Sequence, residues 1–279
     1  MSATAAEVAR FLGEIGQLQM FVTAVGDDPE SIALTGVSSD VAAAGPGDLA
    51  WSRAAEAATF RGGLLICPAP APAPEVLAPG RAVAACVAPR LAMAEVLDRF
   101  FAELGADREP VYAESGLAEV VAANLSWVRN AIVGPGVRIA QHVVIGCSGM
   151  GYERDPNDGR LVAFPQFGGV LLEADVDVAA HATIQRGALG DTVLRRGAKI
   201  GPHVNVGHNA KIGEDVLVAG HAQLGGGCRI GRGAVVWQSA VIANRVTVGE
   251  GAVIGMAAAV RKDVGPGEVW AGNPASRLR

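Results

Sequence analysis

The sequence lacks the features that mark several large classes of protein. Aromatic residues make up only 5% of its 279 residues, whereas glycines number 37, which favours a scaffold with many turns over an ordinary mixed core. No apolar run approaches the roughly 20 residues that span a bilayer, and the N-terminus has no basic segment followed by an apolar one. We therefore expect a cytoplasmic protein without a membrane span or a secretory leader.

An excess of basic charge and a cysteine framework are missing as well. The formal net charge is -5 at pH 7, so the chain lacks the basic surface that neutralises nucleic-acid phosphates, and we expect no nucleic-acid partner. None of the four cysteines stands in a C-x-x-C spacing. This pattern favours reduced, buried thiols over a disulfide framework or a zinc site, at Cys67, Cys86, Cys147 and Cys228.

The chain does contain a repeat with a period of six. An aliphatic residue stands at every sixth position from Leu194 to Val260, and a small inward residue follows each one four places later. Glycine often comes directly after the aliphatic residue, where the backbone must turn without a Cβ in the way. Three such hexads close one triangular coil of a hexapeptide-repeat β-helix. We therefore predict a mainly β fold, a left-handed parallel β-helix, preceded by a small α/β domain.

The repeat also predicts the domain organisation. It extends upstream with two interruptions, a long insertion over 151–169 and four extra residues around GALGD at 187–191. Insertions in a solenoid form loops on one face, and such loops commonly build the binding site. The mixed helical and strand patterns before the repeat indicate an α/β domain over 1–114, with a possible nucleotide site. The β-helix is then expected over 115–265 and a C-terminal tail over 266–279.

All five histidines lie in the repeat, and one of them differs from the rest. Four occupy the fourth place of their hexad, and three of these, His181, His203 and His221, fall in one column on successive coils once the four extra residues are allowed for. We interpret this column as packing or hydrogen bonding at a subunit contact rather than a metal site, because no carboxylates support it. The remaining one of the four is His142. His208 alone occupies the third place, which makes it the candidate for chemistry.

Several short motifs follow one another in the order found in a known enzyme family. GCSGMGY precedes the long insertion, FPQFGG follows it, and TIQRGALGDT and VGHNAKIG come next. In this order and spacing the chain resembles the UDP-3-O-(3-hydroxyacyl)glucosamine N-acyltransferases of lipid A synthesis, up to about Val260. The resemblance implies a homotrimer in which His208 is the general base and the amide of Gly226, one coil of 18 residues further on, stabilises the oxyanion. It further implies substrate contacts from Trp51, Gln166, Arg186, Asn209 and Arg245.

The same resemblance implies the substrates. An acyl group, a 3-hydroxyacyl group in the family, would pass from a phosphopantetheine thioester on acyl carrier protein or coenzyme A to the amine of a nucleotide-linked amino sugar. No metal and no tightly bound cofactor are expected. An acidic carrier protein would need basic partners, and the chain offers several basic residues along the repeat that are equally consistent with solvated turns: Arg195, Arg196, Lys199, Lys211 and Arg229.

Departures from the family pattern leave other functions open. Gln185 stands where the family has an aspartate, and Ala54 and Ala57 replace an asparagine and a tyrosine of its uridine-binding segment. The ending VWAGNPASRLR is similar to the GNPA tail of coenzyme A-dependent hexapeptide acetyltransferases. One alternative is therefore a coenzyme A-dependent nucleotide-sugar N-acetyltransferase, and another is a non-catalytic trimeric solenoid scaffold. Carbonic-anhydrase-like chemistry would need converging histidines, and the stacked spacing of His203 and His221 argues against it.

Overall fold

The computed structural model describes all residues except 1, 25, 39–43, 53–59, 73–76 and 115. The chain divides into two compact units. The N-terminal unit combines Met1–Ala106 with Met150–Pro165, and the solenoid unit combines Asp107–Gly149 with Gln166–Arg279. The first boundary therefore falls at residue 106, a few residues before the boundary expected from the repeat.

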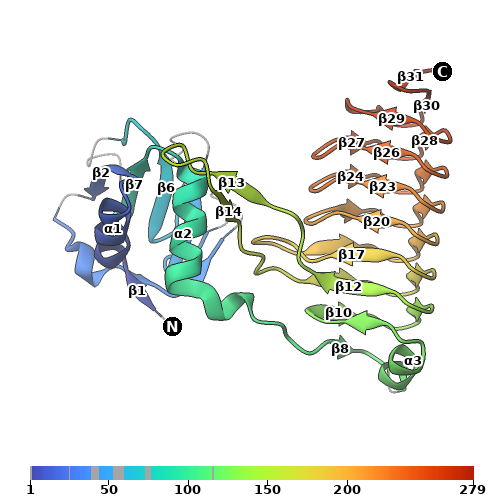
Figure 1. Ribbon diagram of the computed structural model, residues 1–279, viewed down its shortest axis with the longest axis horizontal. Helices are drawn as coiled ribbons and strands as arrows, with labels where there is room; N and C mark the ends of the chain where they lie inside the picture. The colour runs from blue at the N-terminus through green and yellow to red at the C-terminus, as the bar shows by residue number, and fades with distance from the viewer. Residues whose placement is uncertain (1, 25, 39–43, 53–59, 73–76, 115) are drawn as a thin grey trace. The chain divides into compact units, whose positions relative to one another are not determined.

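The N-terminal unit is built on a five-stranded sheet with the order β2-β7-β6-β5-β4 (Figure 1). β2 is antiparallel to β7, and the other neighbours are parallel. The central strands β6 and β7 are short apolar runs that are buried along almost their whole length, as expected for parallel strands covered on both faces. The strands are β2 Leu18–Thr23, β4 Gly36–Val37, β5 Asp48–Trp51, β6 Leu64–Pro68 and β7 Ala82–Cys86, with a separate antiparallel pair of β1 Ala3–Thr4 and β3 Ala33–Leu34.

Two helices of this unit pack against each other. α1 (Ala5–Glu14) begins after Thr4, which forms a reciprocal capping box with Glu7. α2 (Pro89–Phe101) begins with a proline, whose missing N–H would have no partner at the first helical position. Phe11 and Phe100 meet edge to face with their ring centroids 5.5 Å apart. With the single turns η1 (Pro29–Ser31) and η3 (Ala102–Gly105), these elements form the small α/β domain that the sequence predicts.

The long insertion contains a β-hairpin of the N-terminal unit. Its strands β13 (Tyr152–Arg154) and β14 (Leu161–Ala163) are antiparallel. The hairpin is attached to α2 by an ion pair between Arg90 and Glu153. The repeat pattern predicts this segment, 151–169, to be a loop of the β-helix domain. An ion pair between segments far apart in the chain leaves no periodic signal, so the spacing of apolar residues could not show this attachment.

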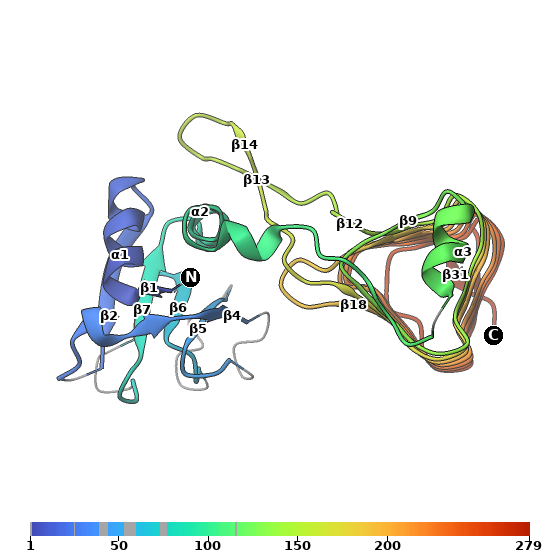
Figure 2. The same cartoon turned by 90° about the horizontal axis from the view of Figure 1, so that it is seen from below.

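The solenoid unit consists of three sheets, parallel except for the last strand β31, that form the sides of a triangular coil (Figures 1 and 2). We call them face 1, face 2 and face 3. Face 1 contains β8 Val111–Tyr112, β10 Ala131–Val133, β15 Val170–Leu172, β18 Thr192–Leu194, β21 Lys211–Ile212, β24 Arg229–Ile230 and β27 Thr247–Val248. Face 2 contains β11 Arg138–Ile139, β16 Asp177–Val178, β19 Lys199–Ile200, β22 Leu217–Val218, β25 Val235–Val236, β28 Val253–Ile254, β30 Val269–Ala271 and β31 Ser276–Arg277. Face 3 contains β9 Trp127–Val128, β12 Val144–Cys147, β17 Thr183–Gln185, β20 Asn205–Val206, β23 Gln223–Leu224, β26 Val241–Ile242 and β29 Ala259–Val260.

The strand register confirms that three hexads make one coil. Ile200 pairs with Val218, and Val218 pairs with Val236, at intervals of 18 residues. The aliphatic position of each hexad points inward and is buried, with Leu224 at 1% exposure as an example. A small residue beside it leaves room for the three sides to meet. The fold is therefore the left-handed parallel β-helix that the sequence predicts.

Both ends of the solenoid carry additional elements. α3 (Leu117–Ala123) lies at the start and buries Val121 in the solenoid core. At the other end β30 pairs in parallel with β28, and β31 returns antiparallel to β30. The residues from 266 onward, expected to be a separate tail, thus extend face 2, because their backbone continues the hydrogen-bonded ladder.

The corners of the solenoid place non-glycine residues in the left-handed conformation. This conformation occurs at the fourth place of many hexads, including His203 (φ 57°), Asn209 (φ 61°) and Arg245 (φ 63°). Asparagine, aspartate and histidine tolerate it better than most residues. The fourth-place histidines therefore occupy a position that the backbone restricts, whereas the third place of His208 carries no such restriction.

The helices and the cysteines can be compared with the expectations from the sequence. In the part of the chain that the structure describes, no helix has both the length and the hydrophobicity to cross a membrane. All four cysteines are free thiols: Cys67, Cys86 and Cys228 are buried, and Cys147 is half-buried. Burial raises the pKa of Cys86 and of Cys228 to about 12, which keeps these thiols protonated at neutral pH.

Candidate functional site

One corner of the solenoid carries both insertions and His208. We call it the insertion corner, and it comprises the turns that lead from face 3 to face 1. The long insertion follows β12 of face 3, and the four extra residues follow β17. The next three turns of this corner are 207–210, 225–228 and 243–246. Stacking of the coils thus brings Gly226 and Arg245 into the same corner as His208 and Asn209.

The imidazole of His208 is held between two glycines. A Cβ built on Gly149 would lie 2.9 Å from Cβ and Cδ2 of His208, and a Cβ built on Gly226 would lie 2.6 Å from its Nε2 atom. Any larger residue at either position would displace the ring. The half-buried ring is therefore confined by backbone, with its Nε2 atom at Gly226. Gly149 closes the GCSG motif, but its role as one wall of the ring's slot was not evident from the sequence.

Asn209 determines which imidazole nitrogen of His208 carries the proton. The Oδ1 atom of Asn209 accepts a hydrogen bond from Ala188 N at 2.9 Å, while its Nδ2 atom donates to Gly190 O at 2.7 Å. These two contacts fix the orientation of the carboxamide. His208 Nδ1 lies 3.0 Å from Oδ1, which can only accept, so Nδ1 must donate. In the neutral ring Nε2 then holds a free lone pair, which suits it to accept a proton.

Gln185 supports the same turn from the coil below. Its Oε1 atom accepts a hydrogen bond from the backbone N–H of His208 at 3.1 Å. The sequence marked this position only as a departure from an aspartate. A carboxamide oxygen accepts from an N–H as a carboxylate does, without adding a negative charge beside the imidazole. Thr192 completes the support by accepting from the N–H of Asn209 at 2.8 Å.

The amide of Gly226 already has a partner. Its N–H donates to Oδ1 of Asn244, one coil further along, at 2.9 Å. The resemblance assigned this N–H to the oxyanion, whereas in this structure it is hydrogen-bonded to Asn244. Arg245, the neighbouring predicted substrate residue, is exposed on the same corner, and its N–H donates to Gly226 O at 2.9 Å. Asn244 itself was not among the residues that the sequence motifs indicated.

Two predicted substrate contacts are instead buried. Arg186 is 1% exposed, and its Nε atom donates to Gly168 O at 2.7 Å. Burial and the nearby Arg108 lower the pKa of its guanidinium. Gln166, at 7% exposure, is buried as well. Burial shields both side chains from a ligand. We therefore assign Arg186 to holding the ends of the two insertions together. A linear motif does not reveal whether a residue is buried.

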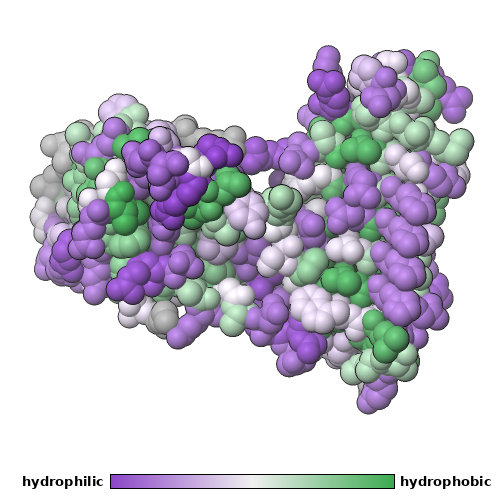
Figure 3. All heavy atoms as spheres, in the orientation of Figure 1, coloured by the Kyte–Doolittle hydropathy of each residue, from purple (hydrophilic) through white to green (hydrophobic). Residues whose placement is uncertain are grey.

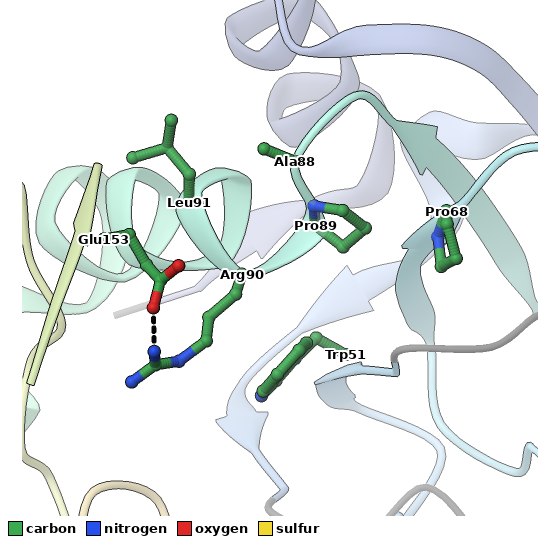
Figure 4. A pocket seen from close by; sticks show the side chains of 7 residues that line it. All are labelled: Trp51, Pro68, Ala88, Pro89, Arg90, Leu91 and Glu153. Atoms are coloured by element: carbon green, nitrogen blue, oxygen red, sulfur yellow. Dashed lines mark ion pairs between the residues drawn. The ribbon is translucent and has the colours of Figure 1, made fainter. Parts of the chain in front are cut away.

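Trp51 lies in a pocket of the N-terminal unit (Figure 4). The pocket has a volume of about 320 Å³ and is lined by Trp51, Pro68, Ala88, Pro89, Arg90, Leu91 and Glu153. Arg90 pairs with Glu153, so the two charges in the pocket neutralise each other. The guanidinium of Arg90 also lies 5.0 Å from the ring centroid of Phe164. Trp51 thus lines a pocket, whereas Ala54 and Ala57 lie outside the described residues.

The remaining four histidines form a ladder on the corner between face 2 and face 3. Their rings are stacked with centroids 5.0 Å apart for His142 and His181, and 4.8 Å apart for each of the next two pairs, up to His221. The predicted column is therefore confirmed, and His142 extends it. Figure 3 shows hydrophilic side chains in a row along the stack of coils. Parallel rings do not converge on a metal ion, and no group of three or more metal-ligand side chains occurs among the described residues.

Comparisons with known proteins find a family model that matches part of the repeat. Residues 191–226 match the family described as bacterial transferase hexapeptide (six repeats). A UDP-3-O-acylglucosamine N-acyltransferase from Methylobacillus flagellatus is 48% identical over 77 residues, which are 28% of this chain and 21% of that protein. An enzyme of the same name from Paraburkholderia phytofirmans is 38% identical over 103 residues, 33% of this chain and 28% of that protein. The chain thus matches about a fifth to a quarter of the length of these curated relatives, and the matches support the resemblance seen in the motifs.

Solved structures with a similar arrangement are more distant in sequence. A UDP-N-acetylglucosamine acyltransferase is 20% identical, with a TM-score of 0.49 over 55% of this chain and 57% of that chain. A UDP-N-acetylglucosamine acyltransferase from Bacteroides fragilis is 16% identical, with a TM-score of 0.48 over 61% of this chain and 60% of that one.

Proposed function

We propose that this protein is an N-acyltransferase that moves an acyl group from a phosphopantetheine thioester to the amine of a nucleotide-linked amino sugar. The observation that carries the proposal is the hydrogen bond between His208 and Asn209, which leaves the Nε2 atom of a confined imidazole free to accept a proton. Names of the curated relatives support the same reaction class. No step of this reaction requires a metal or redox cofactor.

His208 would act as the general base in this reaction. An amine that attacks a thioester carbonyl must lose a proton, and Nε2 is the nitrogen of His208 that can take it. The positive charge that develops on the ring would be stabilised by Oδ1 of Asn209 at 3.0 Å from Nδ1. The same imidazolium can then return the proton to the departing thiolate. Asn209 therefore acts as a positioning residue, which differs from the direct substrate contact implied by the resemblance.

The two substrates would be recognised by different features. The pocket at Trp51 offers an aromatic face for a nucleotide base, and the Arg90–Glu153 ion pair adds no net charge to it.

The basic residues along the solenoid give little support to an acidic carrier protein, because most of them form ion pairs or hydrogen bonds within the chain. Arg195 and Lys199 pair with Glu173 and Asp177 at 2.5 Å and 2.9 Å, and Lys211 donates to a backbone carbonyl. Coenzyme A and acyl carrier protein both remain candidate donors.

A direct test compares donors on one acceptor. UDP-3-O-acylglucosamine is incubated with a series of 3-hydroxyacyl thioesters of acyl carrier protein, with the same series on coenzyme A, and with acetyl-coenzyme A, and products are identified by mass spectrometry. We expect an N-acylated nucleotide sugar together with an equal amount of free thiol. Transfer from acetyl-coenzyme A alone would favour the N-acetyltransferase alternative. Absence of turnover with every thioester would support the non-catalytic scaffold.

We further propose that three copies of the chain assemble through face 2. Its outward positions in successive coils are apolar, with Leu217 39% exposed and Val235 and Val253 half-buried. Trp237, beside this row, is 40% exposed. A sheet face with a continuous apolar row is suited to burial against another copy. The charged outward residues Asp177 and Lys199 of the earlier coils do not continue into this row.

Sedimentation equilibrium tests the assembly. Replacing Val235 with glutamate would bury a charge in the contact, so we expect the mass to fall from three chains to one chain of 28.4 kDa. The matched control is Gln223→Glu, which adds the same charge at an outward, exposed position of face 3. A monomeric wild-type protein, or an unchanged trimer of the Val235→Glu variant, would contradict the proposed contact.

A further inference from the structure

The third places of three successive hexads at the insertion corner form a column of His208, Gly226 and Asn244. Neighbouring coils pair in register at intervals of 18 residues, so these residues are stacked on one another. Gly226 lies against Nε2 of His208, and Asn244 reaches back to the amide of Gly226. The column thus places a proton acceptor, a backbone amide and a side-chain carboxamide next to one another.

The contact between Gly226 and Asn244 fixes the orientation of the carboxamide. The N–H of Gly226 can only donate, so the atom of Asn244 that lies 2.9 Å away must be the oxygen. The nitrogen on the same carbon is therefore on the other branch of the planar group. Of the residues that the structure describes, none hydrogen-bonds to Nδ2 of Asn244, and the residue is exposed. Two N–H donors of this side chain are available to a ligand.

We propose that Nδ2 of Asn244 is the oxyanion donor of the reaction, oriented by the amide of Gly226. This assignment rests on the proposed function of the site. The amine of the acceptor must lie within about 3 Å of Nε2 to lose its proton. We place the thioester carbonyl beyond the amine, roughly one coil spacing of 4.8 Å from the imidazole along the stack of coils. That is the level of Gly226 and of the carboxamide that hydrogen-bonds to it.

The chemical step balances with these groups alone. The amine lone pair forms the new C–N bond while the carbonyl π electrons move onto the oxygen, and Nε2 of His208 takes the amine proton. Nδ2 of Asn244 donates to the oxyanion. When the carbonyl re-forms, the C–S bond breaks, and the thiolate receives the proton from the imidazolium. Asn244 would therefore touch the reacting oxygen, and Gly226 would act through Asn244 as a positioning residue.

Two substitutions of Asn244 separate this role from the role assigned to the Gly226 amide. Asn244→Asp keeps an oxygen for the N–H of Gly226 but removes the donor and adds a negative charge. We expect kcat to fall by about 10²–10³-fold, the effect of losing one side-chain oxyanion donor, with KM of the thioester within about threefold. Asn244→Gly removes the carboxamide and frees the Gly226 N–H. We expect kcat of this variant to fall by at least about 10-fold.

The matched control is Gln238→Glu, which makes the same amide-to-acid change at the third place of an exposed hexad on the other side of face 3. Thermal unfolding of every variant establishes that each one folds. A wild-type kcat in either Asn244 variant, or a higher kcat in Asn244→Gly, would overturn the assignment of Nδ2 of Asn244 as oxyanion donor. It would instead favour the Gly226 amide as that donor. If His208→Ala loses activity in the same assay, the proposed function stands even when the Asn244 assignment fails. Absence of wild-type turnover would overturn both.

Discussion

Replacing His208 with alanine is expected to lower kcat by about 10²–10⁴-fold, the usual contribution of a general base. In the proposed reaction the imidazole takes the amine proton at Nε2, because its Nδ1 atom donates to Asn209. KM for both substrates should change little, since the ring contributes to proton transfer rather than to ground-state binding. The measurement is steady-state transfer to the amino-sugar nucleotide with the donor that the wild-type protein accepts.

The ladder offers the control for this prediction. His221→Ala removes an exposed imidazole from the same solenoid, at the end of a stack with His203 at 4.8 Å. This variant should retain the wild-type kcat, so a loss confined to His208→Ala cannot be attributed to the removal of a histidine as such. Full activity of His208→Ala would contradict the general-base assignment.

The Gly226→Ala variant is expected to lower kcat by at least about 10²-fold. Its methyl group would lie 2.6 Å from Nε2 and 2.9 Å from Cε1 of His208, and Gly149 prevents the ring from moving away on its other side. The imidazole must then rotate and lose its hydrogen bond to Asn209. A displacement of about 1 Å at a reacting group costs on this order. The effect should appear in kcat, with the fold and the thermal unfolding temperature nearly unchanged.

A double substitution shows whether the methyl group acts through the ring. If it does, Gly226→Ala should add almost nothing once His208 is already alanine, because the two changes remove the same interaction. Gly220→Ala is the matched control at the third place of a hexad on the histidine ladder's corner, where the nearest atom to the new methyl is Pro202 O at 3.2 Å. Independent, additive losses, or a wild-type rate for Gly226→Ala, would contradict this account.

Much of the solenoid could be predicted from the chain because the repeat is regular. A spacing of six residues, with an aliphatic anchor and a small residue in each hexad, specifies which side chains point inward. It also specifies which residues are stacked, since neighbours lie 18 residues apart. The column of His181, His203 and His221 followed from this arithmetic alone, as did the proximity of Gly226 to His208.

The parts that could not be predicted depend on contacts without a period. The inserted hairpin packs on α2 through Arg90 and Glu153, so its segment belongs to the N-terminal unit. Arg186, read as a substrate contact from its motif, is 1% exposed and binds the backbone of Gly168. Both outcomes arise where the insertions interrupt the hexads, and there the spacing no longer determines which residues are neighbours.

By itself the sequence determined the architecture, because a solenoid is almost one-dimensional and each coil contacts only the next. It also singled out His208, the histidine that does not share the hexad place of the others. Only the tertiary structure decided how the atoms of the site are oriented. Nδ1 of His208 faces Asn209, and Oδ1 of Asn244 faces the amide of Gly226. These orientations depend on donors and acceptors supplied by adjacent coils and by the inserted residues, and residue spacing carries no information about them.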